Sequence, residues 1–208
     1  MQAIELVRSI VRRFMRRIAG TLNALSRGKL DPDTVTIIGC AMHIPIAILI
    51  GMQHYNLWAA LLLLIFGLFD TLDGELARLQ KRDSPRGMLL DASTDRFKEA
   101  MLYTGIGYAL ALSHHPQTAA LAAAACGASI SVSYVKAKGE AAVAASQDIP
   151  HATLNRLFKD GLLTFELRMF LLLVGLIINQ LAIITGIIAV LASYTALQRL
   201  ARISKVVA

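Results

Sequence analysis

Apolar and basic residues alternate with helical spacing at the start of the chain. Residues 3–19 place their apolar side chains at steps of three or four, so these side chains share one face of a helix. The apolar positions are Ile4, Val7, Val11, Phe14 and Ile18. Arginines fill the opposite face, a pattern typical of a helix that lies in the plane of a membrane interface instead of crossing it.

Beyond Asp31-Pro32-Asp33, which breaks the pattern, the apolar positions form long runs. Several runs approach the roughly 20 residues that a helix needs to cross the hydrocarbon core of a bilayer. The six runs cover about residues 35–53, 57–76, 97–113, 118–135, 162–179 and 181–198. They predict an all-α integral membrane protein, a single domain over residues 1–208. In it the interfacial helix precedes a bundle of six transmembrane helices within residues 35–204.

Basic residues predict how this bundle is oriented. Residues 1–30 carry seven Arg or Lys against one acid, whereas the turns at 54–56, 114–116 and 179–180 carry no Arg or Lys. The other basic ends hold Arg78, Lys81, Arg82, Arg86, Lys136, Lys138, Arg156, Lys159, Arg199, Arg202 and Lys205. By the positive-inside rule, both termini and the polar ends of the spans face the cytoplasm.

Composition supports a membrane protein. Hydrophobic residues make up 56% of the chain, the mean hydropathy is +0.58, and the formal net charge is +7. With this much apolar sequence, the basic N-terminal segment favours an anionic membrane surface over nucleic acid as a partner. The first 20 residues lack the uninterrupted apolar core of a signal peptide. Cys40 and Cys126 have no metal-ligand spacing and are expected to be buried thiols.

Four aspartates stand where spans 2 and 3 reach the basic side. Asp70 and Asp73 are three residues apart, and Asp91 and Asp95 are four apart, so each pair projects to one side of its helix. Neighbouring antiparallel helices would bring the four carboxylates together. Such a cluster needs a counter-charge at the edge of a bilayer. All-oxygen ligands suit Mg²⁺, or Mn²⁺ in its place.

Metal ions held by carboxylates at a membrane surface commonly handle phosphates, where they clamp a diphosphate and orient an in-line attack. Gly74 leaves the helix backbone open to a ligand, and Arg78 lies one turn further, where it could bind a phosphate bidentately. A carboxylate partly free of metal could accept the proton of an attacking hydroxyl. Two other functions stay open: a divalent-cation transporter, with the acids as a permeation site, and a non-catalytic scaffold.

The motif D-x2-D-G-x2-A-R-x8-G-x3-D-x3-D, over residues 70–95, resembles the signature of the CDP-alcohol phosphotransferase family without a gap or substitution. Six spans and a basic interfacial helix also fit this family. The resemblance implies a site of two metal ions and transfer of a phosphatidyl-type group from a CDP-lipid to a small alcohol, with release of CMP. It also implies a homodimer.

Residue roles follow from the same resemblance. Asp70, Asp73 and Asp91 would bind metal, and Asp95 would be a ligand, the general base, or both. Gly74, Arg78 and Ser84 would meet the CDP diphosphate. Asp33-Thr34-Val35-Thr36 resembles the family's Pro-Asn/Asp-x-x-Thr stretch, which lines the cytidine pocket. An ordinary N-cap at the start of span 1 would explain these four residues equally well.

The acceptor alcohol is suggested by sequence further along the chain. Residues 133–140, Ser-Tyr-Val-Lys-Ala-Lys-Gly-Glu, resemble a stretch of phosphatidylinositol-phosphate synthases, and Gln198-Arg199 resembles their Gln-Arg pair. The resemblance implies an inositol 1-phosphate acceptor and a phosphate pocket formed by Lys136, Lys138, Arg168 and Arg199. Simple positive-inside flanking would also explain these cations.

One departure weakens the match to these synthases. They usually start span 5 with Arg-x-Glu-Arg, whereas this chain has Phe165-Glu166-Leu167-Arg168. Arg168 matches the second arginine, but Phe165 replaces the first. Glycerol 3-phosphate, an anionic acceptor, would use a similar basic pocket. The sequence therefore leaves open the acceptor, the choice between a diacylglycerol and an archaeal diether lipid, and the oligomeric state.

Overall fold

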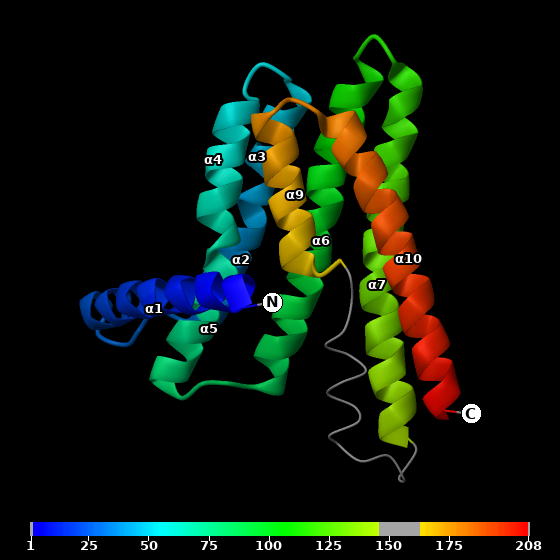
Figure 1. Cartoon of the computed structure of the whole chain (residues 1–208). Helices are drawn as coiled ribbons and strands as arrows, with labels where there is room; N and C mark the ends of the chain where they lie inside the picture. Colours follow the sequence, from blue (N-terminus) through cyan, green and yellow to red (C-terminus); the bar gives the residue numbers. More distant parts are fainter. Residues whose placement is uncertain (1, 146–162, 208) are drawn as a thin grey trace.

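The structure, a computed structural model, describes residues 2–145 and 163–207, and side chains within 9–142 and 163–205. The described part is all-helical and contains no strand, which confirms the predicted fold class. Its elements are α1 (Gln2–Leu25), α2 (Pro32–Ala41), α3 (His43–Gly51), α4 (Asn56–Gly67), α5 (Phe69–Gln80), α6 (Pro85–Ala111), the 3₁₀ turn η1 (Pro116–Thr118), α7 (Ala119–Ala145), α9 (Phe165–Ile177) and α10 (Leu181–Val207). Figure 1 shows the long helices running alongside one another as a bundle.

Four stretches among the described residues are long and apolar enough to cross a membrane, so the chain is a multi-pass membrane protein. They are Pro32–Gly51, Asn56–Gln80, Pro116–Ala142 and Leu181–Lys205. The apolar run 97–113 belongs to the longer α6, which begins at Pro85 and carries several charged residues. The run 162–179 corresponds to α9, which has 13 residues. Residue 162 and the basic residues Arg156 and Lys159 lie outside the described part.

The first two predicted spans are each divided into two helices. Met42 separates α2 from α3, and Leu68 separates α4 from α5. Both junction residues keep right-handed helical dihedrals, and the Leu68 N–H bonds to the Ile65 carbonyl oxygen, three residues back, at 3.2 Å. Such a tightened turn offsets the helix without ending it.

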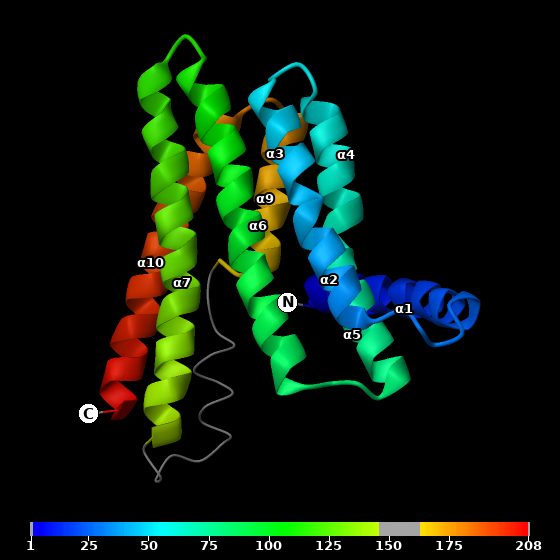
Figure 2. The same ribbon diagram turned by 180° about the vertical axis from the view of Figure 1, so that it is seen from behind.

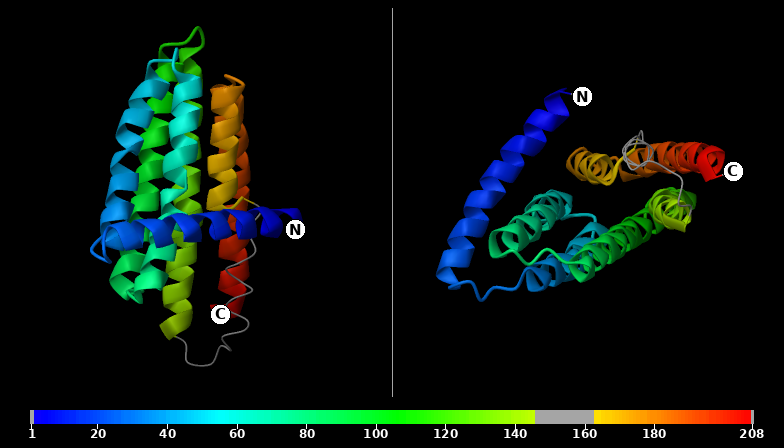
Figure 3. Two further views of the ribbon diagram at one scale, coloured as in Figure 1. Left: turned by 90° about the vertical axis from the view of Figure 1, so that its left-hand side faces the viewer. Right: turned by 90° about the horizontal axis from the view of Figure 1, so that it is seen from below.

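Helix α1 lies across the bundle instead of along it (Figure 3). Its buried Met15 and Ala19 pack with Val35 of α2 and with Leu72 and Leu76 of α5 in a small hydrophobic cluster. The apolar face predicted for this helix is therefore only partly covered by protein. Val11 and Ile18 pack against the same cluster, whereas 59% of Phe14 is exposed. The side chains of Ile4 and Val7 lie outside the described part.

A second, larger hydrophobic core joins the remaining helices. It takes buried residues from α3, α4, α6, α7, α9 and α10, and α7 and α10 run side by side at one flank of the molecule (Figure 2). Cys40 and Cys126 are free thiols, as predicted, but each is only half-buried.

Helices α3 and α6 approach most closely at a glycine. A Cβ placed on Gly105 of α6 would lie 2.3 Å from the backbone oxygen of Ala47 in α3, which no side chain tolerates. Gly105 therefore sets how closely α6 approaches α3. This contact fixes the helix that carries two of the four aspartates.

Candidate functional site

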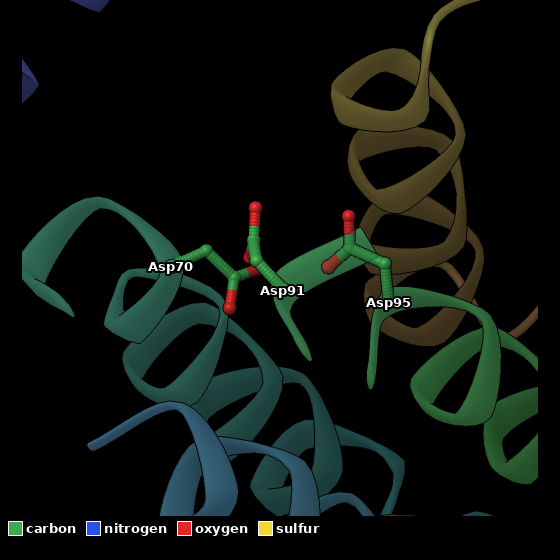
Figure 4. A group of neighbouring side chains, drawn as sticks. All are labelled: Asp70, Asp91 and Asp95. Carbon is green, nitrogen blue, oxygen red and sulfur yellow. The ribbon is translucent and has the colours of Figure 1, made fainter. Parts of the chain in front are cut away.

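Three of the four aspartates converge between α5 and α6. Asp70 lies in the first turn of α5, and Asp91 and Asp95 lie on successive turns of α6. One carboxylate oxygen from each lies within 4.8 Å of those from the other two. Figure 4 shows the three side chains pointing toward a common space. The convergence predicted from the spacing is confirmed for these three residues.

The connection between α5 and α6 places the two helices antiparallel. Lys81 ends α5 in the left-handed conformation, with φ of 54°. Ser84 caps α6, because its Oγ accepts a hydrogen bond from the Gly87 N–H at 3.1 Å, and Pro85 follows at the first helical position. The chain reverses direction across this connection, and α2 packs against both helices. The Ser84 hydroxyl thus has a structural role beside the proposed contact with diphosphate.

Asp73 lies outside the group of three carboxylates. Its side chain is buried, and one oxygen accepts a hydrogen bond from the Thr36 hydroxyl of α2 at 2.5 Å. Asp73 therefore connects α5 to the start of α2. Thr36 was singled out as a residue of the cytidine pocket, and this contact places it beside the motif. A metal-binding role for Asp73 stays a prediction.

Lys98 and Arg96, two cations that were not predicted from the sequence, border the aspartates. Lys98 of α6 is 1% exposed, and its Nζ contacts an Asp70 oxygen and lies 3.4 Å from an Asp95 oxygen. Arg96 lies 3.5 Å from the other Asp95 oxygen. The run 97–113 was interpreted only as an apolar span, which hid Lys98. A lysine inside such a run, three residues after an aspartate, was the signal that could have identified it.

Helix α5 presents Gly74 and Arg78 beside the aspartates. A Cβ on Gly74 would meet only the Arg78 guanidinium, at 3.7 Å, so packing within the described protein does not require a glycine there. The side chain of Arg78 is half exposed and pairs with the buried Glu75. Glu75 also accepts a hydrogen bond from Arg16 Nε of α1 at 2.9 Å. Glu75 therefore links α1 to the helix that carries the motif.

The segment Asp33-Thr34-Val35-Thr36 forms the first turns of α2, because Asp31 is the N-cap and Pro32 the first helical residue. Asp33 lies 3.7 Å from Arg86 Nε at the start of α6. Asp33 is not the N-cap of α2, since Asp31 has that position, and its carboxylate faces the first turn of α6, which Ser84 caps. The starts of α2 and α6 thus lie together.

The predicted acceptor pocket shows a different arrangement for each cation. Arg168 is 1% exposed, and it donates from Nε to Glu99 at 2.7 Å and from Nη1 to the Leu163 carbonyl at 3.1 Å. Its guanidinium is therefore committed to a buried ion pair. Phe165 lies close to two guanidiniums, with Arg96 5.1 Å and Arg168 5.9 Å from the ring centroid.

The other three cations belong to α7 and α10. Arg199 is buried and donates to the Val132 carbonyl at 3.3 Å, while its Nε has no hydrogen-bond partner among the described residues. Lys136 is half exposed and lies 3.7 Å from Glu140. The Lys138 ammonium lies 5.8 Å from the centroid of the Tyr134 ring. Arg199 thus has a buried Nε donor without a partner among the described residues, whereas the Lys136 side chain is accessible.

The aspartate site on this helical bundle defines a class of membrane enzyme. The chain belongs to the CDP-alcohol phosphatidyltransferase family, whose model matches residues 29–198. This match contains all four aspartates and the segment that includes Thr36.

Sequence similarity to individual curated proteins extends over a little more than half of this chain. A phosphatidylinositol phosphate synthase of Corynebacterium glutamicum is 36% identical over 115 residues, which cover 54% of this chain and 52% of that protein. The chain thus spans about half the length of the curated relatives it matches. The crystal structure of Mycobacterium tuberculosis phosphatidylinositol phosphate synthase with CDP-DAG bound is similar with a TM-score of 0.77 at 25% identity, covering 92% of this chain and 94% of that one. A structure of the same synthase in complex with manganese and citrate also has a TM-score of 0.77 at 25% identity, covering 91% and 88%.

Proposed function

We propose that this protein is an integral membrane phosphatidylinositol phosphate synthase, which transfers the phosphatidyl group of CDP-diacylglycerol to inositol 1-phosphate and releases CMP. The convergence of Asp70, Asp91 and Asp95 within the family's motif carries the proposal. The similarity to phosphatidylinositol phosphate synthases supports the acceptor, and the CDP-DAG complex of one of them supports the donor. Membership of an enzyme family argues against the cation transporter and the scaffold.

The aspartates fit a divalent cation. Three carboxylate oxygens within 4.8 Å of one another form the all-oxygen ligand set that hard cations prefer. The manganese complex of the similar synthase supports the same class of ion. We infer Mg²⁺ as the resident ion, with Mn²⁺ as a substitute, and two ions when the donor is bound. Asp73 would complete the ligand set. Bound ions would neutralise charge on the donor's diphosphate.

The residues of the chain would divide the remaining work. Gly74 leaves room for the diphosphate against α5, and Arg78 would donate to its oxygens, with Ser84 alongside. The cytidine would lie against the start of α2, from Asp33 to Thr36. Asp95 would accept the proton of the acceptor hydroxyl, which attacks the lipid-side phosphorus as CMP leaves.

The acceptor phosphate would bind between α7 and α10. Arg199 supports this, because a buried guanidinium with an unpartnered Nε gains a hydrogen bond when an anion arrives. Lys136 and Lys138 would add positive charge at the rim. Arg168 was also expected here, and its commitment to Glu99 leaves Nη2 as the group that would contact the phosphate.

The membrane arrangement belongs to the same proposal. Helices α6 and α9 run within the bundle, beside α7 and α10 respectively, and would be the third and fifth of six spans. Helix α1 would lie in the cytoplasmic interface, with both termini and the active site on that side. We further propose a single domain over residues 1–208 and a homodimer.

Purified protein tests the function directly. With CDP-diacylglycerol and Mg²⁺, CMP release should require an added acceptor and be fastest with inositol 1-phosphate among inositol 1-phosphate, glycerol 3-phosphate, inositol and serine. Asp95→Asn should abolish CMP release and retain binding of CDP-diacylglycerol, whereas the exposed Asp83→Asn should behave like the wild type. Preference for glycerol 3-phosphate would overturn the acceptor. Full activity of Asp95→Asn would overturn the role of Asp95.

A further inference from the structure

Lys98 places a positive charge inside the aspartate site. Its Nζ lies against Asp70 and Asp95, one from each helix of the site, and the side chain is 1% exposed. Lys98 follows Asp95 by three residues on α6, so the two side chains lie on the same side of that helix. It is not part of the motif that runs from residue 70 to residue 95.

A buried ammonium is costly unless it is paired. Moving such an ion out of water is strongly unfavourable, and nearby carboxylates must offset that cost. Asp70 and Asp95 provide this compensation for Lys98. The relation also works in the other direction, because Lys98 reduces the repulsion between two carboxylates that the fold forces together.

The charges around Lys98 form one connected network. Asp70 contacts Lys98, Lys98 approaches Asp95, Asp95 approaches Arg96, Arg96 binds Glu99 at 2.5 Å, and Glu99 binds Arg168. The members of the site and network are Asp70, Asp73, Asp91, Asp95, Glu99, Arg96, Lys98 and Arg168. Five carboxylates against three cations leave two negative charges, which a single divalent cation neutralises.

We propose that Lys98 is a fixed counter-ion of the aspartate site, and that it limits the free protein to one tightly bound divalent cation. A second ion binds the free protein weakly and binds well only when a donor diphosphate adds negative charge. Lys98 is thus a positioning residue that holds Asp70 and Asp95 and sets how many ions bind. The inference rests on the proposed metal-binding function of the site.

Metal titration of the full-length protein in detergent tests the inference. Protein stripped of metal is titrated with Mn²⁺ alone, and free Mn²⁺ is followed by electron paramagnetic resonance. The wild type should bind one Mn²⁺ tightly and a second at least about tenfold more weakly, because a unit charge at this range is worth more than the 1.4 kcal/mol of a tenfold change. Lys98→Met should bind two ions with similar affinity. Lys205→Met removes an exposed lysine far along α10 and should match the wild type.

Two further measurements keep the result interpretable. In EDTA, Lys98→Met should unfold at a lower temperature than the wild type and should gain more from added Mn²⁺. Lys98→Gln also removes the charge and replaces Lys98→Met if that variant does not fold, whereas Lys98→Arg keeps the charge and should keep the single tight ion. Two equally tight ions in the wild type, or in Lys98→Arg, overturn the role of Lys98 while leaving the enzyme intact. A wild type that binds no Mn²⁺ overturns the metal site itself.

Discussion

The buried ion pair between Glu99 and Arg168 allows a sharp test of what holds α6 to α9. Glu99 is fully buried and accepts hydrogen bonds from Arg168 Nε at 2.7 Å and from Arg96 Nη1 at 2.5 Å. Glu99→Gln removes the negative charge and keeps the size of the side chain. Arg168, 1% exposed, would then retain a buried charge with no acid paired to it among the described residues.

The expected loss follows from that uncompensated charge. Removing one partner of a buried ion pair typically costs about 3–5 kcal/mol of folding free energy. This lowers the ratio of folded to unfolded protein by a factor between about 10² and 10⁴. The half-exposed pair of Lys136 and Glu140, 3.7 Å apart, provides the matched control. Glu140→Gln should cost no more than about 1 kcal/mol, because exposed pairs contribute little.

Denaturant titration in detergent, followed by circular dichroism, measures both variants against the wild type. The double variant Glu99→Gln, Arg168→Gln should lose less stability than the sum of the two single variants, because it leaves no unpaired charge. A loss for Glu99→Gln no larger than that for Glu140→Gln would refute the reasoning, since Arg168 would then be compensated by other groups.

Three further outcomes follow from the structure. Gly105→Ala should destabilise the protein by at least about 1–3 kcal/mol, because the added Cβ would overlap the Ala47 backbone. Gly127→Ala, where an added Cβ meets nothing within 4 Å, should not destabilise the protein, and thermal unfolding compares the two variants. Thr36→Val should cost about 1–3 kcal/mol because the buried Asp73 loses the hydrogen bond from the Thr36 hydroxyl, and unchanged stability in the same assay would contradict this. EDTA should stop CMP release, and excess Mg²⁺ should restore it; activity that persists in EDTA would contradict the proposed metal site.

The aspartate site was the most predictable part of the molecule. Helical spacing alone places Asp91 and Asp95 on one side of a helix, and the reversal of the chain between α5 and α6 allows Asp70 to converge with them. The spacing of Asp70 and Asp73 did not reveal that Asp73 is held by Thr36 of α2, because that contact joins residues 37 positions apart.

The buried charges were harder to predict because their partners are distant in sequence. Glu99 and Lys98 stand at the start of an apolar run, where a hydropathy average conceals them. The partner of Glu99, Arg168, lies 69 residues further along the chain. The breaks at Met42 and Leu68 were also not predicted, because both lie within long apolar stretches, although Gly67 directly precedes Leu68 and Pro45 follows Met42 by three residues.

The contact between Arg16 and Glu75 can form only late in synthesis. These two residues are 59 positions apart, and α1 leaves the ribosome well before α5 is made. Until α5 is in place, Met15 and Ala19 lack Leu72 and Leu76, which complete their hydrophobic cluster. A basic helix with an apolar side can wait on the surface of the membrane during that interval. Helix α1 therefore reaches its final contacts only after two spans have been inserted.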